Sequence, residues 1–156
     1  SADDVIWPLE QPTYRFCTWK VPGSFLSGQD CVKGEDAIAK VPESHRNFVG
    51  KMLTLSATAN PEDVKSILGR EIWKSGAKHE FKFGGQKASA QTYWWWAGDS
   101  TDLIGDYRFE ADGAMSVTYI NGIVDKATLF FGRRWLFEIT LADTKCLMNC
   151  RSTDSK

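Results

Sequence analysis

Four adjacent aromatic residues, Tyr93-Trp94-Trp95-Trp96, form the most unusual stretch of this 156-residue chain, which contains seven tryptophans. On a strand, Tyr93 and Trp95 would face one way and Trp94 and Trp96 the other, because successive side chains alternate between two faces. One pair can therefore enter a core while the other lies on a second surface. The stretch is either a strand that is buried on both sides, or the wall of a pocket or a platform for a sugar ring, an apolar small molecule or a partner protein.

Histidine-based catalysis has little support in the sequence. His79 and Glu80 begin a run with a strand pattern, so their side chains would point to opposite faces, and His45 lies near Glu43 in an expected loop. The chain has no Gly-x-Ser-x-Gly elbow, P-loop, dinucleotide fingerprint or His-Glu-x-x-His motif. We therefore assign no catalytic residue and no cofactor, although the sequence leaves open a small barrel enzyme with an apolar active-site cavity.

The four cysteines are Cys17, Cys31, Cys146 and Cys150. Zinc sites need closely spaced ligand pairs, which this spacing does not offer, so we expect no metal site. Two disulfides are the more economical interpretation, either Cys17–Cys31 with Cys146–Cys150 or two long-range bridges. Disulfides imply an oxidising compartment, and the short polar start of the chain is compatible with a mature N-terminus, so we expect a secreted or periplasmic protein.

The charge balance excludes several partner classes. Nineteen Lys and Arg against twenty Asp and Glu give a net charge of −1, so no global basic field exists to attract nucleic acid. Basic residues gather between 65 and 87 and acidic residues between 99 and 112, which we interpret as the solvated faces of neighbouring hairpins. The acidic stretch lacks the ligand spacing of a calcium loop. No apolar run is long enough to span a membrane.

The clearest predicted helix lies at about residues 60–69. Asn60 can cap its first turn, Pro61 is preorganised for the first helical position, and Gly69 fits a left-handed stop. Residues 34–41 also fit a short helix. Residues 44–53 fit either a helix or a loop that enters a strand, and the periodicity does not decide between them.

Residues 78–141 have the pattern of an antiparallel β meander. Turn residues such as Asp112-Gly113 and Asn121-Gly122 divide this segment into short runs, and apolar residues occupy every second position, as in Trp135, Phe137 and Ile139. We therefore predict a single domain over residues 1–156, all-β, in which the meander closes into a small barrel or a flattened sandwich. Residues 1–45 are expected to be rich in loops around one strand at 13–19.

Three segments resemble the lipocalin-like (calycin) group of small β-barrels: residues 48–51 before a possible first strand, 105–113, and 132–137. The resemblance covers roughly the last two thirds of the chain. It departs from the group after Gly50, where a tryptophan would be expected and the chain has Met52 and Leu53. The resemblance implies a small apolar ligand held inside the barrel and transfers no residue-specific binding motif.

Two main functional classes follow from these patterns. The first is a binding protein that holds a small apolar or sugar-like ligand in an aromatic-lined cavity. The second is a protein–protein interaction module, of an inhibitor or immunity type, that uses exposed tryptophans. The direction in which the aromatic side chains point discriminates between them. The candidate ligand-binding residues are Tyr93, Trp94, Trp95, Trp96, Tyr107, Tyr119 and Trp135.

Overall fold

The computed structural model describes residues 7–21, 24–71, 73–83, 86–97, 102–104, 107–110 and 112–143. Within them, seven strands form one sheet in the order β2-β1-β9-β8-β7-β4-β3, and β5 pairs with β6 in a separate hairpin. All strand pairs are antiparallel, which confirms the predicted all-β class. The strands are β1 (Trp7–Trp19), β2 (Gln29–Lys33), β3 (Lys74–Phe83), β4 (Gln86–Trp96), β5 (Asp102–Ile104), β6 (Tyr107–Phe109), β7 (Gly113–Ile120), β8 (Ile123–Phe131) and β9 (Trp135–Asp143).

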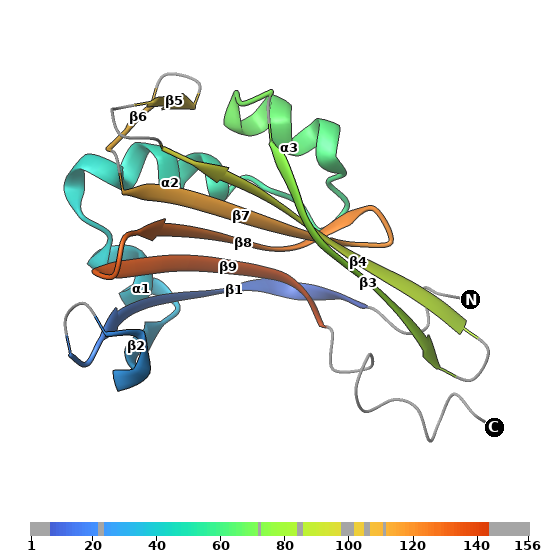
Figure 1. The fold of residues 1–156 in the computed structure, drawn as a ribbon, viewed down its shortest axis with the longest axis horizontal. Coiled ribbons are helices and arrows are strands. Elements are labelled where there is room, and N and C mark those ends of the chain that lie inside the picture. The colour runs from blue at the N-terminus through green and yellow to red at the C-terminus, as the bar shows by residue number, and fades with distance from the viewer. Residues whose placement is uncertain are drawn as a thin grey trace.

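The sheet is open rather than closed into a barrel. Its edge strands, β2 and β3, do not pair with each other in the described part of the chain. Helices cover one face of the sheet instead, and the β5–β6 hairpin lies beside them (Figure 1). We call the face toward the helices the inner face and the opposite one the outer face. The three α-helices are α1 (Glu35–Lys40), α2 (Arg46–Met52) and α3 (Pro61–Leu68), and short 3-10 turns lie at Phe25–Ser27 and Glu43–His45.

The predicted helix at 60–69 is confirmed as α3, with the expected caps. The Asn60 side chain accepts a hydrogen bond of 2.9 Å from the Asp63 backbone N–H, and the Asp63 carboxylate accepts one of 3.0 Å from the Asn60 N–H. This reciprocal pair is a capping box, which satisfies two backbone donors at the helix start. Gly69 ends the helix in the left-handed conformation, with φ of 75°.

The first 45 residues contain more regular structure than the expected loops. They contribute β1, β2 and α1, and β1 begins well before the strand predicted at 13–19. The register of β1 with β9 shifts between Pro8 and Thr13. This irregularity accommodates Pro12, because proline has no N–H to donate to a strand ladder.

One hydrophobic core fills the space between the inner face and the helices. One row of residues that are paired from strand to strand crosses five strands and is buried throughout. It consists of Trp95, Met115, Leu129, Phe137 and Phe16. Each large apolar side chain in it gains about 1.5–3 kcal/mol from burial. The helices complete this core by contributing Ala37 of α1, Phe48 of α2 and Val64 of α3.

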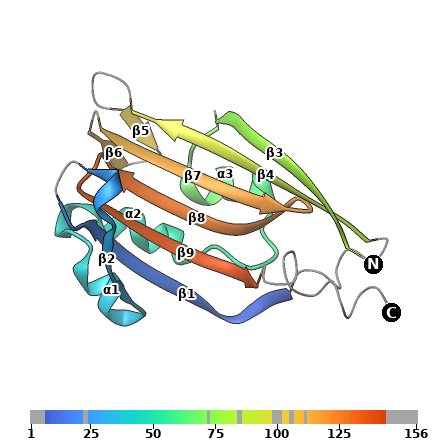
Figure 2. The ribbon, with the colours of Figure 1, turned by 60° about the horizontal axis from the view of Figure 1, so that its bottom comes forward.

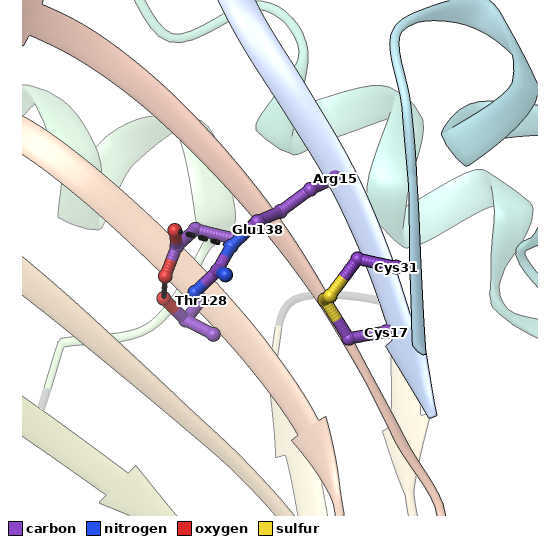
Figure 3. Close-up of polar contacts among 5 residues, drawn as sticks. All are labelled: Arg15, Cys17, Cys31, Thr128 and Glu138. Atoms are coloured by element: carbon purple, nitrogen blue, oxygen red, sulfur yellow. Dashed lines mark hydrogen bonds and ion pairs between the residues drawn. A yellow bond between two sulfur atoms is a disulfide. The ribbon is translucent and has the colours of Figure 1, made fainter. Parts of the chain in front are cut away.

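The described helices leave the outer face uncovered (Figure 2), and this face carries a polar network and a disulfide (Figure 3). The Glu138 carboxylate accepts hydrogen bonds of 2.9 Å from Arg15 Nε and 2.8 Å from the Thr128 hydroxyl. Cys17 and Cys31 face each other across β1 and β2 and form a disulfide. The other two cysteines lie outside the described residues. Where the structure describes the chain, none of its helices is long and apolar enough to cross a membrane.

Candidate functional site

The aromatic stretch of β4 divides between the two faces of the sheet, as predicted. Trp95 lies in the core with 2% of its surface exposed, and Tyr93 packs against the same core. Trp96 is 50% exposed on the outer face, where Trp94 stacks against it. The predicted site residues therefore do not line one common cavity.

Three of the predicted residues on the inner side belong to one aromatic cluster. Trp95 and Tyr107 both contact Phe109, with ring centroids 4.4 and 4.8 Å apart. Trp135 stacks on Phe131 at 4.9 Å, and Phe131 in turn stacks on Phe109 at 5.8 Å. Trp95 and Trp135 are buried in this cluster, whereas Tyr107 reaches its edge.

Tyr93 and Tyr119 form a separate pair with ring centroids 5.6 Å apart in an edge-to-face arrangement. Tyr119 is buried, and this burial, with smaller contributions from Tyr93 and Glu62, raises the pKa of its hydroxyl well above the usual value. The phenol therefore stays protonated and neutral throughout the physiological range. This pair supplies buried aromatic surface on the inner face rather than a charged group.

A groove of about 360 Å³ lies between α2 and β6. It is lined by Asn47, Phe48 and Lys51 of α2 and by Tyr107 of β6. Asn47 and Lys51 are four residues apart and so share one helix face. Phe48 and Tyr107 form the aromatic wall, with ring centroids 5.0 Å apart. Of the residues predicted from the sequence to bind a ligand, Tyr107 is the one that lines this groove.

His45 lies directly behind the groove, at the junction between a 3-10 turn and α2. Its imidazole is packed among the rings of Phe131, Trp135 and Tyr107, at centroid distances of 4.2, 5.3 and 5.5 Å. Burial lowers the pKa of His45, while Glu110 raises it and Arg134 lowers it to smaller extents. The ring is therefore neutral at pH 7, with one nitrogen as donor and one as acceptor.

Two buried polar atoms at this place have no hydrogen-bond partner among the described residues: His45 Nδ1 and the Tyr107 hydroxyl. A buried polar atom that lacks a partner costs about 1–3 kcal/mol, so native proteins keep few of them. Tyr107 lines the groove and its hydroxyl is buried in the groove wall, so a polar group of a bound molecule would reach this hydroxyl after a small movement of the ring. The groove thus combines an aromatic wall, a hydrogen-bonding hydroxyl and the ammonium group of Lys51.

A second, smaller cavity of about 150 Å³ lies between α1 and α2. Its volume is below the range of about 300–1,000 Å³ that is typical of ligand pockets. Its lining is mostly apolar, so we interpret it as imperfect packing between two short helices. The lining residues are Ile38, Ala39, Val41, Arg46, Val49, Gly50 and Leu53.

The sequence analysis did not identify Asn47, Phe48 or Lys51 as groove residues, nor His45 as the residue behind the groove. The available signal was the apolar stripe of residues 44–53, which fits a helix or a strand entry equally well. Nothing local in the sequence indicates that this helix packs beside Tyr107, which lies more than fifty residues later. Within the described ranges, no group of three or more His, Cys, Asp or Glu side chains could hold a metal ion.

No protein-family model, curated protein or solved structure matches this chain.

Proposed function

We propose that this protein binds a small amphiphilic molecule in the groove between α2 and β6. The observation that carries the proposal is the buried Tyr107 hydroxyl, which has no partner among the described residues and belongs to a residue on the groove wall. A buried hydroxyl of this kind is stabilised when a ligand supplies the missing hydrogen bond. The aromatic ring that carries it offers an apolar surface at the same place.

The lining residues indicate the chemistry of the ligand. The rings of Phe48 and Tyr107 suit an apolar ring or chain, and the Asn47 amide and Tyr107 hydroxyl suit a hydrogen-bonding group. Lys51 adds a positive charge, which favours a carboxylate or another anionic group. The volume of about 360 Å³ is near the lower end of the range for ligand pockets, so the ligand is small.

The proposed site is similar in one respect to the ligand sites expected from the resemblance to the lipocalin-like group. In both cases the ligand is held beside the apolar face of an antiparallel sheet, but here helices rather than a closed barrel complete the enclosure. We further infer export to an oxidising compartment, either secretion or the periplasm. The support for export is the disulfide between Cys17 and Cys31.

Titration with 1-anilinonaphthalene-8-sulfonate, an aromatic anion that fluoresces in apolar surroundings, tests the proposal. We expect saturable binding by the folded protein, and an affinity about fivefold lower in both Tyr107→Phe and Lys51→Gln, since each loses one hydrogen bond or charge contact. Lys33→Gln is the matched control, because Lys33 is exposed on β2, far from α2 in the fold. Unchanged affinity in both groove variants would overturn the proposal.

A further inference from the structure

The outer face of the sheet carries an aromatic platform, which consists of Trp94, Trp96 and Phe130. Trp94 and Trp96 stack in parallel with ring centroids 5.2 Å apart and an interplanar angle of 8°. Trp94 also stacks on Phe130, at 5.9 Å and 23°. Strand β7 lies between β4 and β8, which separates the two backbones by about 9.6 Å. The side chains of Trp94 and Phe130 therefore bridge β7.

Small residues make room for the platform. In register, Ala114 lies between Trp96 and Phe130, and Ser116 lies beside Trp94. Both small residues are 8% exposed, although they belong to the face that carries no helix (Figure 2). This burial agrees with aromatic rings that lean over β7 and cover it.

The position of the Trp94 ring is fixed from the other side by Gly76 of β3. A Cβ atom on Gly76 would stand 2.8 Å from Cδ1 and 2.9 Å from Nε1 of Trp94, closer than real side chains approach. The absence of a side chain on Gly76 thus lets the indole lie against β3. Trp94 in turn supports one face of Trp96, whose side chain remains half exposed.

Polar groups border the platform on two sides. Beyond Trp96 and Phe130 along the strands, Arg134 Nη2 lies 2.8 Å from the Asp112 carboxylate and 3.8 Å from that of Glu110. These three side chains are about half exposed or more. On the opposite side, the row of Ser116, Thr128 and Glu138 is polar but largely buried, and the Glu138 carboxylate already accepts hydrogen bonds from Arg15 and Thr128 (Figure 3).

We propose that this platform is a second binding site, separate from the groove, for a neutral saccharide. A sugar ring has an apolar C–H face that can stack on an exposed indole, and a rim of hydroxyls that suits paired carboxylate and guanidinium groups. The exposed guanidinium group of Arg134 is already paired with Asp112 and Glu110, so it does not offer a free positive charge to a phosphate, and a neutral ligand is favoured. Among the tryptophans whose side chains are described, Trp96 is the most exposed, with half of its surface accessible. This exposed surface is small compared with the roughly 800 Å² per partner of a stable protein interface.

Saccharide binding is measured by saturation-transfer NMR and calorimetry with neutral hexasaccharides of glucose, xylose and N-acetylglucosamine as probes. We expect at least one of these probes to bind, and Trp96→Ala to lower its affinity about tenfold or more through the loss of the stacking surface. Trp96→Phe should retain most of the affinity, and Asp112→Asn should lower it without a change in Trp94–Trp96 packing. The control is Leu26→Ala, because Leu26 is the most exposed large apolar residue among the described side chains and lies on the β1–β2 connection.

Two results would overturn the saccharide site. One is the absence of binding by any of the probes at millimolar concentration, and the other is equal affinity in Trp96→Ala and the parent protein. Sedimentation of both proteins adds a third test, because self-association that Trp96→Ala abolishes would make the platform an interface between copies. The groove is tested independently, since Tyr107→Phe should leave saccharide affinity unchanged and Trp96→Ala should leave anilinonaphthalenesulfonate affinity unchanged.

Discussion

The imidazole of His45 packs against the ring of Phe131 with centroids 4.2 Å apart, which places a titratable group inside an aromatic cluster. The rings of Tyr107 and Trp135 flank it on other sides. Aromatic surroundings cannot solvate an imidazolium ion as water does, so the neutral form is favoured. His45 thereby links the wall of the groove to the core of the sheet, and its protonation would disturb both.

Folding stability should therefore fall as the pH falls below 6.5. Because the pKa of His45 is lowered in the folded protein, the unfolded chain binds this proton first. The free energy of unfolding decreases from about pH 7 downward, and this decrease levels off once the folded protein is also protonated. His45→Phe should remove this part of the pH dependence. Urea unfolding at a series of pH values measures it, and an identical slope in the variant would contradict the assignment.

Asp125 should produce a pH dependence of the opposite sign. It is the extra residue of a β-bulge, because Thr118 pairs with Lys126 and Tyr119 with Val124. Its side chain is 6% exposed, and Oδ1 has no hydrogen-bond partner among the described residues. Burial raises the pKa of Asp125 to about 6, with Lys126 opposing the shift and Glu138 adding to it.

Between about pH 4 and pH 6, the unfolded chain loses the Asp125 proton while the folded protein keeps it, so stability falls as the pH rises. The difference between the usual aspartate pKa of 3.8 and the value of about 6 in the folded protein corresponds to a loss of stability of up to about 3 kcal/mol at neutral pH. Asp125→Asn should abolish this loss and be more stable than the parent at pH 7. Thermal unfolding at pH 4 and pH 7 compares the two proteins, and a variant that keeps the parent's decrease would exclude Asp125 as its source.

Local signals in the sequence were sufficient for several elements of the fold. The alternation in β7, β8 and β9 defined their buried faces, and Asn121-Gly122 forms the predicted turn with positive φ at both residues. Asn60 and Gly69 marked the two ends of α3. The pairing of β1 with β9 had no such signal, because contacts such as Cys17 with Leu136 join segments more than a hundred residues apart.

The candidate sites show the same division between local and long-range information. Alternation placed Trp94 and Trp96 on the face opposite Trp95, and that prediction is confirmed. It could not show that the outer rings stack across β7, because this depends on the strand order in the sheet. Likewise, Tyr107 was a predicted site residue, but the helix that faces it was ambiguous in periodicity.

Two glycines should respond to alanine substitution in opposite directions. A Cβ on Gly113 would lie 2.7 Å from Phe109 Cδ1 and 3.2 Å from the Glu110 carbonyl oxygen, so Gly113→Ala should destabilise the fold by about 1–3 kcal/mol through overpacking. A Cβ on Gly50, within α2, meets no atom within 4 Å. Gly50→Ala should therefore stabilise the protein by about 0.5–1 kcal/mol. Chemical denaturation of both variants measures the difference, and equal stability would contradict the described packing around Gly113.

The disulfide between Cys17 and Cys31 should contribute substantially to the stability of the sheet edge. The two residues are directly opposed on β1 and β2, and their sequence separation is 14. Closing a loop of this length stabilises a protein by about 3 kcal/mol, because the bridge restricts the unfolded chain. Cys31→Ala should lower the free energy of unfolding by about this amount, and Cys31 is the better choice because Cys17 is fully buried whereas Cys31 is exposed. Reductant should destabilise the parent more than it destabilises Cys31→Ala, and an equal effect on both proteins would show that this bridge is not the one that reductant breaks.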